Sequence, residues 1–316
     1  SLAKNTYISN DFDADIFAQF PHSFDSDQLS DALEKTIGQF CHNNNSTYER
    51  IHGSRDYFSL VYNNIRCEIV PVLAIDNPQQ AKNVTDCSPL HVQWVKNNST
   101  RVVDQLPVYD HIRLAKLFCK AHHVYGAETY IRGFSGHVLD ILVIYYGGFY
   151  PFIQAVSKWK GKVVIDVQNH YDKSEDVFNH LDSAKTYAPL IVVDPIDKNR
   201  NAAAGLEDKK MQQLIKAAQQ FLDNPSPAYF IYQPLRFENW KKQTNHQVMY
   251  CVEFIAINKH KKDASGAKMR KAAELLVREA VDYGFHIDQW EFWWSGDVEK
   301  PGKLFIGAPD ETLDST

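Results

Sequence analysis

The spacing of apolar and polar residues changes along the chain, and the first region, up to about residue 84, predicts strands around one helix. The runs 57–62 and 65–73 are strand-like and are joined by two polar asparagines, a pattern that predicts a β-hairpin. Apolar residues recur at helical spacing over 26–41, where Ser26 or Asp27 is suited to cap the helix. We therefore expect an α/β unit around a small mixed sheet.

The second region, about 85–206, has the spacing of a mostly helical domain. Helices are predicted over 111–122 and over the strongly apolar segment 136–146, and a short buried strand is predicted over 190–193. A connecting helix over 211–224 is followed by two prolines, which break it and mark a boundary.

The third region predicts the element order strand, helix, strand, strand. The strands are expected at 248–257, 287–294 and 303–306, and the helix at 267–283, where Gly284 provides a common C-terminal stop. This order is typical of ferredoxin-like domains. The fold class expected for the whole chain is α+β.

Acidic residues are the first candidates for chemistry. Asp13 and Asp15 are spaced i, i+2 in a strand-like segment, so their side chains point to the same face, and Glu68 lies in the strand-like run 67–73. If these strands pair, the carboxylates converge, and such a cluster needs cations because like charges repel. Oxygen ligands suit Mg²⁺, and two such ions about 3.5–4 Å apart can clamp the attacking and leaving oxygens of a phosphoryl displacement.

Composition narrows the class of protein. The 316 residues, 44% of them hydrophobic, suffice for two or three domains. No run of 18 apolar residues predicts a transmembrane helix, and the start does not read as a signal peptide. Five cysteines without C-x-x-C spacing predict reduced, buried thiols and argue against a zinc site. We expect a cytoplasmic protein with no membrane partner.

Positive charge is crowded near the C-terminal end of a chain whose net charge is −5. These residues could form a solvated loop and helix face without a specific role, or a surface that binds nucleic-acid phosphates. Charge alone does not separate the two. The candidate residues are Lys259, Lys261, Lys262, Lys268 and Lys271.

An ordered set of motifs over nearly the whole chain resembles the archaeal-type (class I) CCA-adding enzymes, which are tRNA nucleotidyltransferases. The acidic motif alone would also fit poly(A) polymerases, oligoadenylate synthetases and antibiotic nucleotidyltransferases, whereas the set as a whole is specific. The motifs are SLAKNT (1–6), DAD (13–15), EIVP (68–71), DCSPLH (86–91), VYGAE (124–128), RGFSG (132–136) and DPIDKNRN (194–201).

The resemblance implies three domains: a polymerase-β-like nucleotidyltransferase head over 1–84, a helical central domain over 85–227, and an RNA-binding body and tail over 228–316. It implies that Asp13, Asp15 and Glu68 bind the metal ions. It also implies that Arg200 helps present hydrogen-bond donors and acceptors to the base of the nucleotide. The remaining nucleotide contacts of the family correspond to Ser1, Lys4, Ser88, His91, Lys116 and Tyr125.

The chain departs from the family pattern at a few points. The family's third carboxylate is usually Asp, and Glu68 is one methylene longer. A glycine precedes the motif serine in the family, and the family's tail continues beyond the position of Thr316. The first and third domains are therefore expected to be incomplete, as in a fragment or the product of a split gene.

The activity implied by the resemblance is template-independent addition of C, C and A to the 3′ end of tRNA from CTP and ATP, with Mg²⁺ and with release of pyrophosphate. One alternative is a related enzyme that makes poly(A) or oligoadenylate. Incorporation of ATP alone would favour this alternative. Another is a catalytically inactive RNA-binding fragment. A homodimer is compatible with the sequence.

Overall fold

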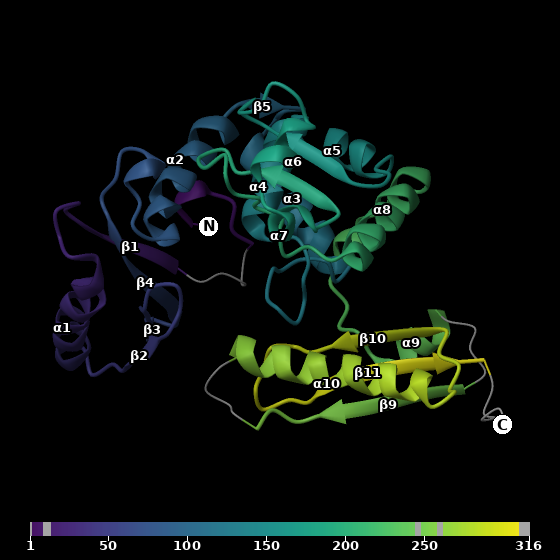
Figure 1. Ribbon diagram of the computed structural model, residues 1–316. Helices are drawn as coiled ribbons and strands as arrows, with labels where there is room; N and C mark the ends of the chain where they lie inside the picture. Colours follow the sequence, from purple (N-terminus) through teal and green to yellow (C-terminus); the bar gives the residue numbers. More distant parts are fainter. Residues whose placement is uncertain (1, 9–13, 244–247, 258–261, 310–316) are drawn as a thin grey trace. The chain divides into compact units, whose positions relative to one another are not determined.

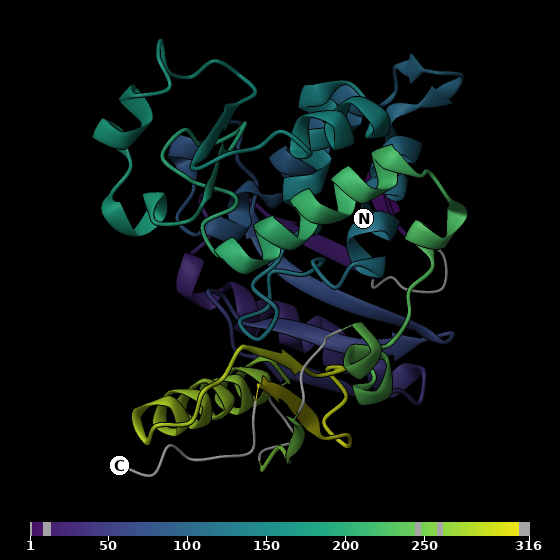
Figure 2. The same cartoon turned by 90° about the vertical axis from the view of Figure 1, so that its right-hand side faces the viewer.

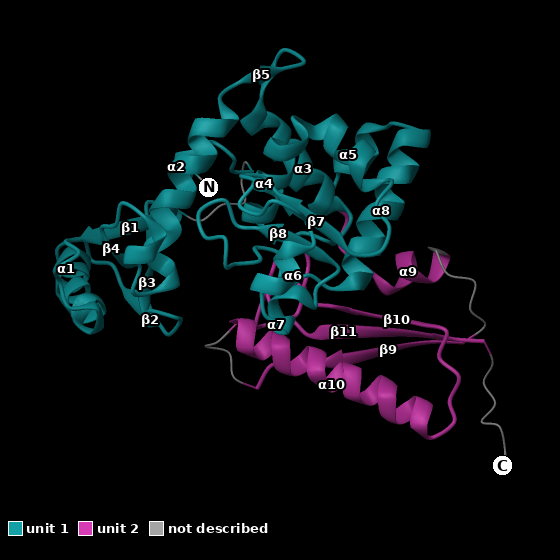
Figure 3. Cartoon of the chain, turned by 45° about the horizontal axis from the view of Figure 1, so that its top comes forward, with its two compact units in different colours: residues 1–125, 134–231 teal, residues 126–133, 232–316 magenta. Residues whose placement is uncertain are grey.

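The structure is a computed structural model that describes residues 2–8, 14–243, 248–257 and 262–309. Two compact units divide the chain (Figure 3). The first comprises 1–125 and 134–231, and the second comprises 126–133 and 232–316. The second unit therefore includes a short segment from the middle of the first. The domain boundaries expected near residues 84 and 227 stay predictions.

The amino-terminal part of the first unit is a sheet with the strand order β1-β4-β3-β2. β1 runs parallel to β4, whereas β3 is antiparallel to both of its neighbours. Helix α1 covers one face of this sheet, where Leu33 and Ile37 share an apolar cluster with Phe58 and Leu60 (Figure 1). The elements are β1 (Ala14–Phe20), α1 (Leu29–Asn43), β2 (Tyr48–Ile51), β3 (Tyr57–Tyr62) and β4 (Ile65–Leu73).

The predicted hairpin is confirmed, because β3 and β4 are joined by Asn63 and Asn64 alone. Both asparagines have positive φ angles, 49° and 64°. Left-handed backbone at both central residues matches the twist of the flanking strands, and asparagine tolerates it better than most residues.

The predicted cap of the first helix is wrong in detail. Residues Ser26–Gln28 form a 3₁₀ turn, and Asp25 caps it by accepting a hydrogen bond from the backbone of Asp27. Helix α1 follows at Leu29 without a side-chain cap of its own. A turn that leads directly into a helix moves the capping position upstream, which the apolar spacing does not reveal.

The rest of the first unit is mostly helical, as expected, around one large apolar cluster. The predicted helix 136–146 matches α4, and the predicted strand 190–193 matches β8, which pairs in parallel with a strand that was not predicted, β7. The elements are η1 (Leu2–Lys4), η3 (Pro78–Gln80), η4 (Val84–Cys87), α2 (Ser88–Ser99), β5 (Val102–Val103), β6 (Leu106–Pro107), α3 (Val108–Ala121), α4 (Gly136–Tyr146), α5 (Phe149–Val156), β7 (Val163–Asp166), α6 (Asp176–His180), α7 (Ser183–Thr186), β8 (Leu190–Val193), α8 (Asp208–Asp223) and η5 (Pro227–Phe230).

The second unit has the expected strand-helix-strand-strand order in an antiparallel sheet, β10-β11-β9. Helix α10 lies along one face of this sheet (Figures 1 and 2), and Met269 and Ala273 share an apolar cluster with Leu304 and Ile306. The elements are α9 (Phe237–Gln243), β9 (Val248–Phe254), α10 (Lys262–Asp282), β10 (Gln289–Trp293) and β11 (Gly302–Ala308).

Helix α10 begins earlier than predicted, so that Gly266 lies inside it. A Cβ atom at this position would lie only 2.4 Å from the ring of Tyr130. Tyr130 belongs to the segment 126–133, and the buried Arg270 donates hydrogen bonds to the carbonyl oxygens of Tyr130 and Ile131, at 3.2 and 3.4 Å. Gly266 is therefore needed for the close approach of this segment and does not mark the start of the helix.

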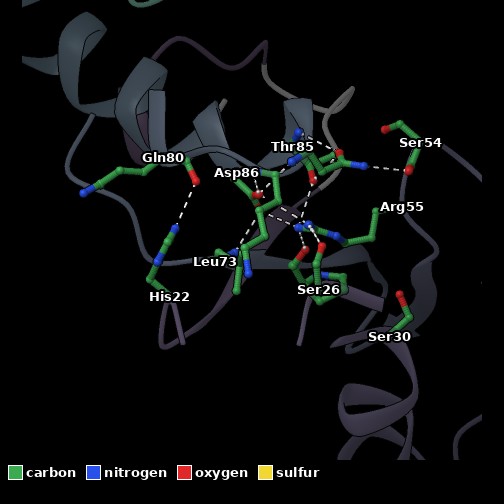
Figure 4. A network of polar contacts seen from close by, with 12 residues as sticks. His22, Ser26, Ser30, Ser54, Arg55, Leu73, Gln80, Thr85 and Asp86 are labelled. Carbon is green, nitrogen blue, oxygen red and sulfur yellow. Dashed lines mark hydrogen bonds and ion pairs between the residues drawn. The ribbon is translucent and has the colours of Figure 1, made fainter. Parts of the chain in front are cut away.

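A buried ion pair between Arg55 and Asp86 joins the sheet to the entry of α2 (Figure 4). Arg55 also donates to the carbonyl oxygen of Pro71 at 3.1 Å, and Asp86 accepts from the backbone of Leu73 at 2.8 Å and Asn83 at 3.0 Å. Burial alone would raise the pKa of Asp86, but the hydrogen bonds from Arg55 and from these backbone groups lower it. Asp86 is therefore ionised and fully bound.

Among the described residues, no single helix is long and apolar enough to cross a membrane. Helices α4 and α5 taken together have a sufficient length and composition, but they are bent by 98° at their junction. All five cysteines lie in described segments and are free thiols. Cys251 is exposed and Cys67 is half-buried, so the prediction that the thiols are buried is wrong for these two residues.

We predict that Arg55→Met lowers the free energy of unfolding by about 3 kcal/mol, because it leaves the charge of Asp86 buried without its cation. Urea denaturation followed by circular dichroism measures this. Since folding lowers the pKa of Asp86, the stabilisation is present above about pH 4 and is lost as the pH falls further. Arg278→Met, which removes an exposed ion pair with Glu279, should change little; equal effects of the two variants would contradict the prediction.

Candidate active site

The predicted acidic site is built by the register of the sheet. Asp15 on β1 is paired with Glu68 on β4, Glu68 with Ser59 on β3, and Ser59 with Glu49 on β2. Paired residues point to the same side of a sheet, so this row lies on the face opposite α1. The sequence motifs singled out Asp15 and Glu68, whereas Glu49 joins their row only through the pairing of β2.

Asp15 is exposed and Glu68 is half-buried. Burial raises the pKa of the neighbouring Tyr57, and the negative charges of Glu68 and Glu49 raise it further. Two carboxylates on neighbouring strands, about 5 Å apart by strand spacing, offer the oxygen ligands that a hard divalent cation prefers. These residues therefore fit a metal ion. Asp13 lies outside the described residues, so its assignment stays a prediction.

A second group joins Lys4 and Lys116 through one buried carboxylate, Asp140. Lys4 Nζ lies 2.5 Å from Asp140 Oδ2, and Lys116 Nζ lies 2.9 Å from Asp140 Oδ1. Lys116 Nζ also donates to the carbonyl oxygen and to Oγ1 of Thr6, each at 3.0 Å. The 3₁₀ turn η1 is thereby tied to helices α3 and α4.

The electrostatics of this group follow from its burial. Burial alone would raise the pKa of Asp140, but the charges of Lys116 and Lys4 lower it to about 2. Burial lowers the pKa of Lys116, and the charge of Asp140 opposes that shift only in part. Asp140 was not predicted as a site residue, because an Asp within the apolar run of α4 has no partner nearby in the sequence.

Tyr125 lies beside this group. A Cβ atom at Gly136, the first residue of α4, would lie 3.1 Å from the Tyr125 hydroxyl and 3.6 Å from Lys116 Nζ. The structure thus brings Tyr125 and Lys116 together at the start of α4, where a larger residue than glycine would crowd them. Ser1, the other residue predicted in this region, lies outside the described residues.

A third group surrounds Asp194, which has no exposed surface. His91 Nε2 lies 2.8 Å from Oδ1, and Arg200 Nη1 donates to Oδ2 at 2.9 Å. His137 Nε2 lies 3.4 Å from Oδ2, and the His91 and His137 rings meet edge to face at 4.5 Å. Ser88 is half-buried in the first turn of α2, the helix that carries His91.

The charges of the third group are fixed by Asp194. Burial opposes its ionisation, but its interactions with His137 and His91 hold the pKa of Asp194 well below the usual value. Burial lowers the pKa of His137 more than Asp194 raises it. His137 and Asp194 were missed as site residues, although Asp194 begins a motif that the sequence singled out.

His91, His137 and Asp194 are close enough together to be considered as ligands of a metal ion. Arg200 argues against this reading, because its guanidinium already lies against Asp194, and a second cation there would be repelled. The backbone of Ile196 also donates to Asp194 Oδ1 at 2.9 Å. Asp15 and Glu68 on the sheet form the better metal site.

The predicted basic residues lie in the second unit. Lys262, Lys268 and Lys271 are exposed on α10, as a solvated face or a phosphate-binding surface would both require. Arg270 differs, because its side chain is 8% exposed and pairs with Glu274 at 2.8 Å. Lys259 and Lys261 lie outside the described residues.

Comparison with known proteins places this arrangement in a family. The family described as "tRNA nucleotidyltransferase, second domain" matches residues 110–231. The CCA-adding enzyme of Nanoarchaeum equitans is 34% identical over 293 residues, which cover 91% of this chain and 69% of the relative. The chain belongs to the family of CCA-adding enzymes. Use of divalent metal ions is implied for this nucleotidyltransferase family.

Other members of the family also match. The CCA-adding enzyme of Thermococcus gammatolerans is 33% identical, with 73% of this chain and 50% of the relative covered. The CCA-adding enzyme of Saccharolobus solfataricus is 28% identical, with 93% of this chain and 65% of the relative covered. The chain thus spans between half and about two thirds of the length of these family members.

A solved structure described as a cytoplasmic RNA terminal U-transferase shares the fold, with a TM-score of 0.53 at 13% sequence identity. The similarity covers 74% of this chain and 84% of that chain. The expected α+β fold with a polymerase-β-like head is confirmed.

Proposed function

We propose that this chain adds C, C and A to the 3′ end of tRNA without a nucleic-acid template, using CTP and ATP. The observation that carries the proposal is the parallel pairing that sets Asp15 opposite Glu68 in a member of the CCA-adding family. Asp13 is proposed as their third partner, from its place in the motif. A cytoplasmic location and a homodimer stay predictions.

In the proposed step, a 3′-hydroxyl oxygen of tRNA bonds to the α-phosphorus of the nucleotide. The bond from that phosphorus to the oxygen bridging the α- and β-phosphates breaks, pyrophosphate leaves with this oxygen, and the hydroxyl proton passes to solvent. Asp15 and Glu68 would hold Mg²⁺, which supplies charge neutralisation and lowers the pKa of the attacking hydroxyl.

The positive charge of Lys4 and Lys116 suits a nucleoside triphosphate. Lys4 and Lys116 are proposed to attract the triphosphate, and Tyr125 to line the same place. His91 and Ser88 on α2 are proposed as further nucleotide contacts, with Ser1 assigned from its motif alone. Arg200, 38% exposed and held by Asp194, is proposed to read the base, because a guanidinium offers donors in a fixed fork.

The alternatives make different demands. An enzyme that makes poly(A) or oligoadenylate would incorporate ATP but not CTP. An inactive RNA-binding fragment would bind tRNA and incorporate neither. Incubation with tRNA that lacks CCA, with each nucleoside triphosphate in turn, separates the three and is the direct test of the proposal.

We predict that Asp15→Asn and Glu68→Gln each lower the rate of CTP and ATP incorporation about 100-fold or more while tRNA binding is kept, because a lost metal ligand acts on the transition state. Single-turnover assays and filter binding measure the two quantities. Glu49→Gln is the matched control, an acid of the same row two strands away from Glu68. Near-normal rates for Asp15→Asn at saturating Mg²⁺ would refute the assignment.

Arg200→Ala should change the choice between CTP and ATP more than it changes tRNA affinity. Arg200→Lys keeps the charge and removes the planar fork, so it should share the loss of discrimination. The ratio of kcat/KM for the two nucleotides is the readout. An equal fall for CTP and ATP would mean that Arg200 acts only by holding Asp194.

The exposed lysines of α10 are proposed to bind tRNA phosphates. A Lys262→Ala/Lys268→Ala/Lys271→Ala variant should weaken all tRNAs similarly and reduce the slope of log K against log salt by about 2 to 3, because each phosphate contact releases counterions. The control variant replaces three exposed lysines of the first unit by alanine and so makes the same change in charge: Lys35, Lys158 and Lys160. Equal slopes for the two variants would favour a solvated helix face.

A further inference from the structure

Asp140 is an acid that two lysines share inside the first unit. Its side chain has no exposed surface, and Lys4 and Lys116 approach its two oxygens separately, at 2.5 and 2.9 Å. Two ammonium groups against one carboxylate leave one positive charge in excess.

The two lysines are not equivalent. Lys116 Nζ donates to the two oxygens of Thr6, each at 3.0 Å, and forms an ion pair with Asp140 Oδ1 at 2.9 Å. Its side chain is 4% exposed. Lys116 is therefore the more enclosed of the two lysines. Lys4 is 13% exposed and belongs to the short turn η1, so Lys4 is the lysine that solvent and a ligand can reach.

We infer that Asp140 is a positioning residue of the nucleotide site, which acts by holding Lys4 where a nucleoside triphosphate can bind it. Thr6 holds Lys116, Lys116 pairs with the carboxylate of Asp140, and this carboxylate holds Lys4. This inference rests on the proposed function, and it concerns the contact of Lys4 with the phosphates. Asp140 itself touches neither substrate.

Equilibrium binding of CTP and of ATP, measured by calorimetry without tRNA so that no turnover occurs, tests the inference. Asp140→Asn should raise the Kd of both nucleotides about tenfold, the size expected when a hydrogen bond to a charged group is lost. In a Lys4→Met background the same change should raise the Kd no further, because the two residues act as one unit. An unchanged Kd, or full additivity of the two changes, would overturn the inference.

Asp86→Asn is the matched structural control. Asp86 is also fully buried and paired with a cation, but its partner is Arg55. It should lower stability without raising the Kd of either nucleotide, and any effect should add to that of Lys4→Met. If Asp140→Asn does not fold, Asp140→Glu keeps the charge balance and displaces Lys4 by one methylene, so the same cycle applies.

Nucleotide addition by the wild-type protein, assayed in parallel, separates this inference from the proposed function. A wild-type protein that binds CTP but adds no nucleotide would refute the function, while the binding cycle still decides the role of Asp140. A wild-type protein that binds neither CTP nor ATP would overturn both.

Discussion

A buried carboxylate must be matched by a cation or by hydrogen-bond donors, and the first unit depends on meeting this demand repeatedly. Asp86, Asp140 and Asp194 have no exposed surface. Arg55 pairs with Asp86, and Lys4 and Lys116 pair with Asp140. Each partner comes from another segment, so neutralising the charge also joins the segments. The sheet, the helical part and η1 are thereby connected by ion pairs as well as by apolar packing.

Much of the fold could be predicted because its signals are local. Consecutive residues determine both the hairpin at Asn63 and Asn64 and the apolar helix 136–146, and both predictions are confirmed. The convergence of Asp15 and Glu68 required one further assumption, that their strands pair, and the parallel register supplies it. The start of α10 could not be found in this way, because the role of Gly266 is set by Tyr130, far away in sequence.

Several members of the candidate site could be predicted, the buried Lys116 among them, whereas some of the residues that pair with them could not. Asp140 and His137 lie in an apolar helix, where spacing alone marks them as core positions. Their partners, Lys4 and Asp194, are identified only once the chain is folded. The basic run shows the same limit, since Arg270 lies among the lysines in sequence but is buried against Glu274, while Lys268 and Lys271 face solvent.

The segment 126–133 has a consequence for how the protein folds. Arg270, Gly266 and Trp294 all contact Tyr130, so the second unit cannot complete its core from residues 232–316 alone. A chain synthesised from its N-terminus presents Tyr130 long before α10 exists, and the contact then closes a loop of more than a hundred residues. Such closure has an entropic cost and raises the contact order, which slows folding. The second unit should therefore be the last part of the chain to become native.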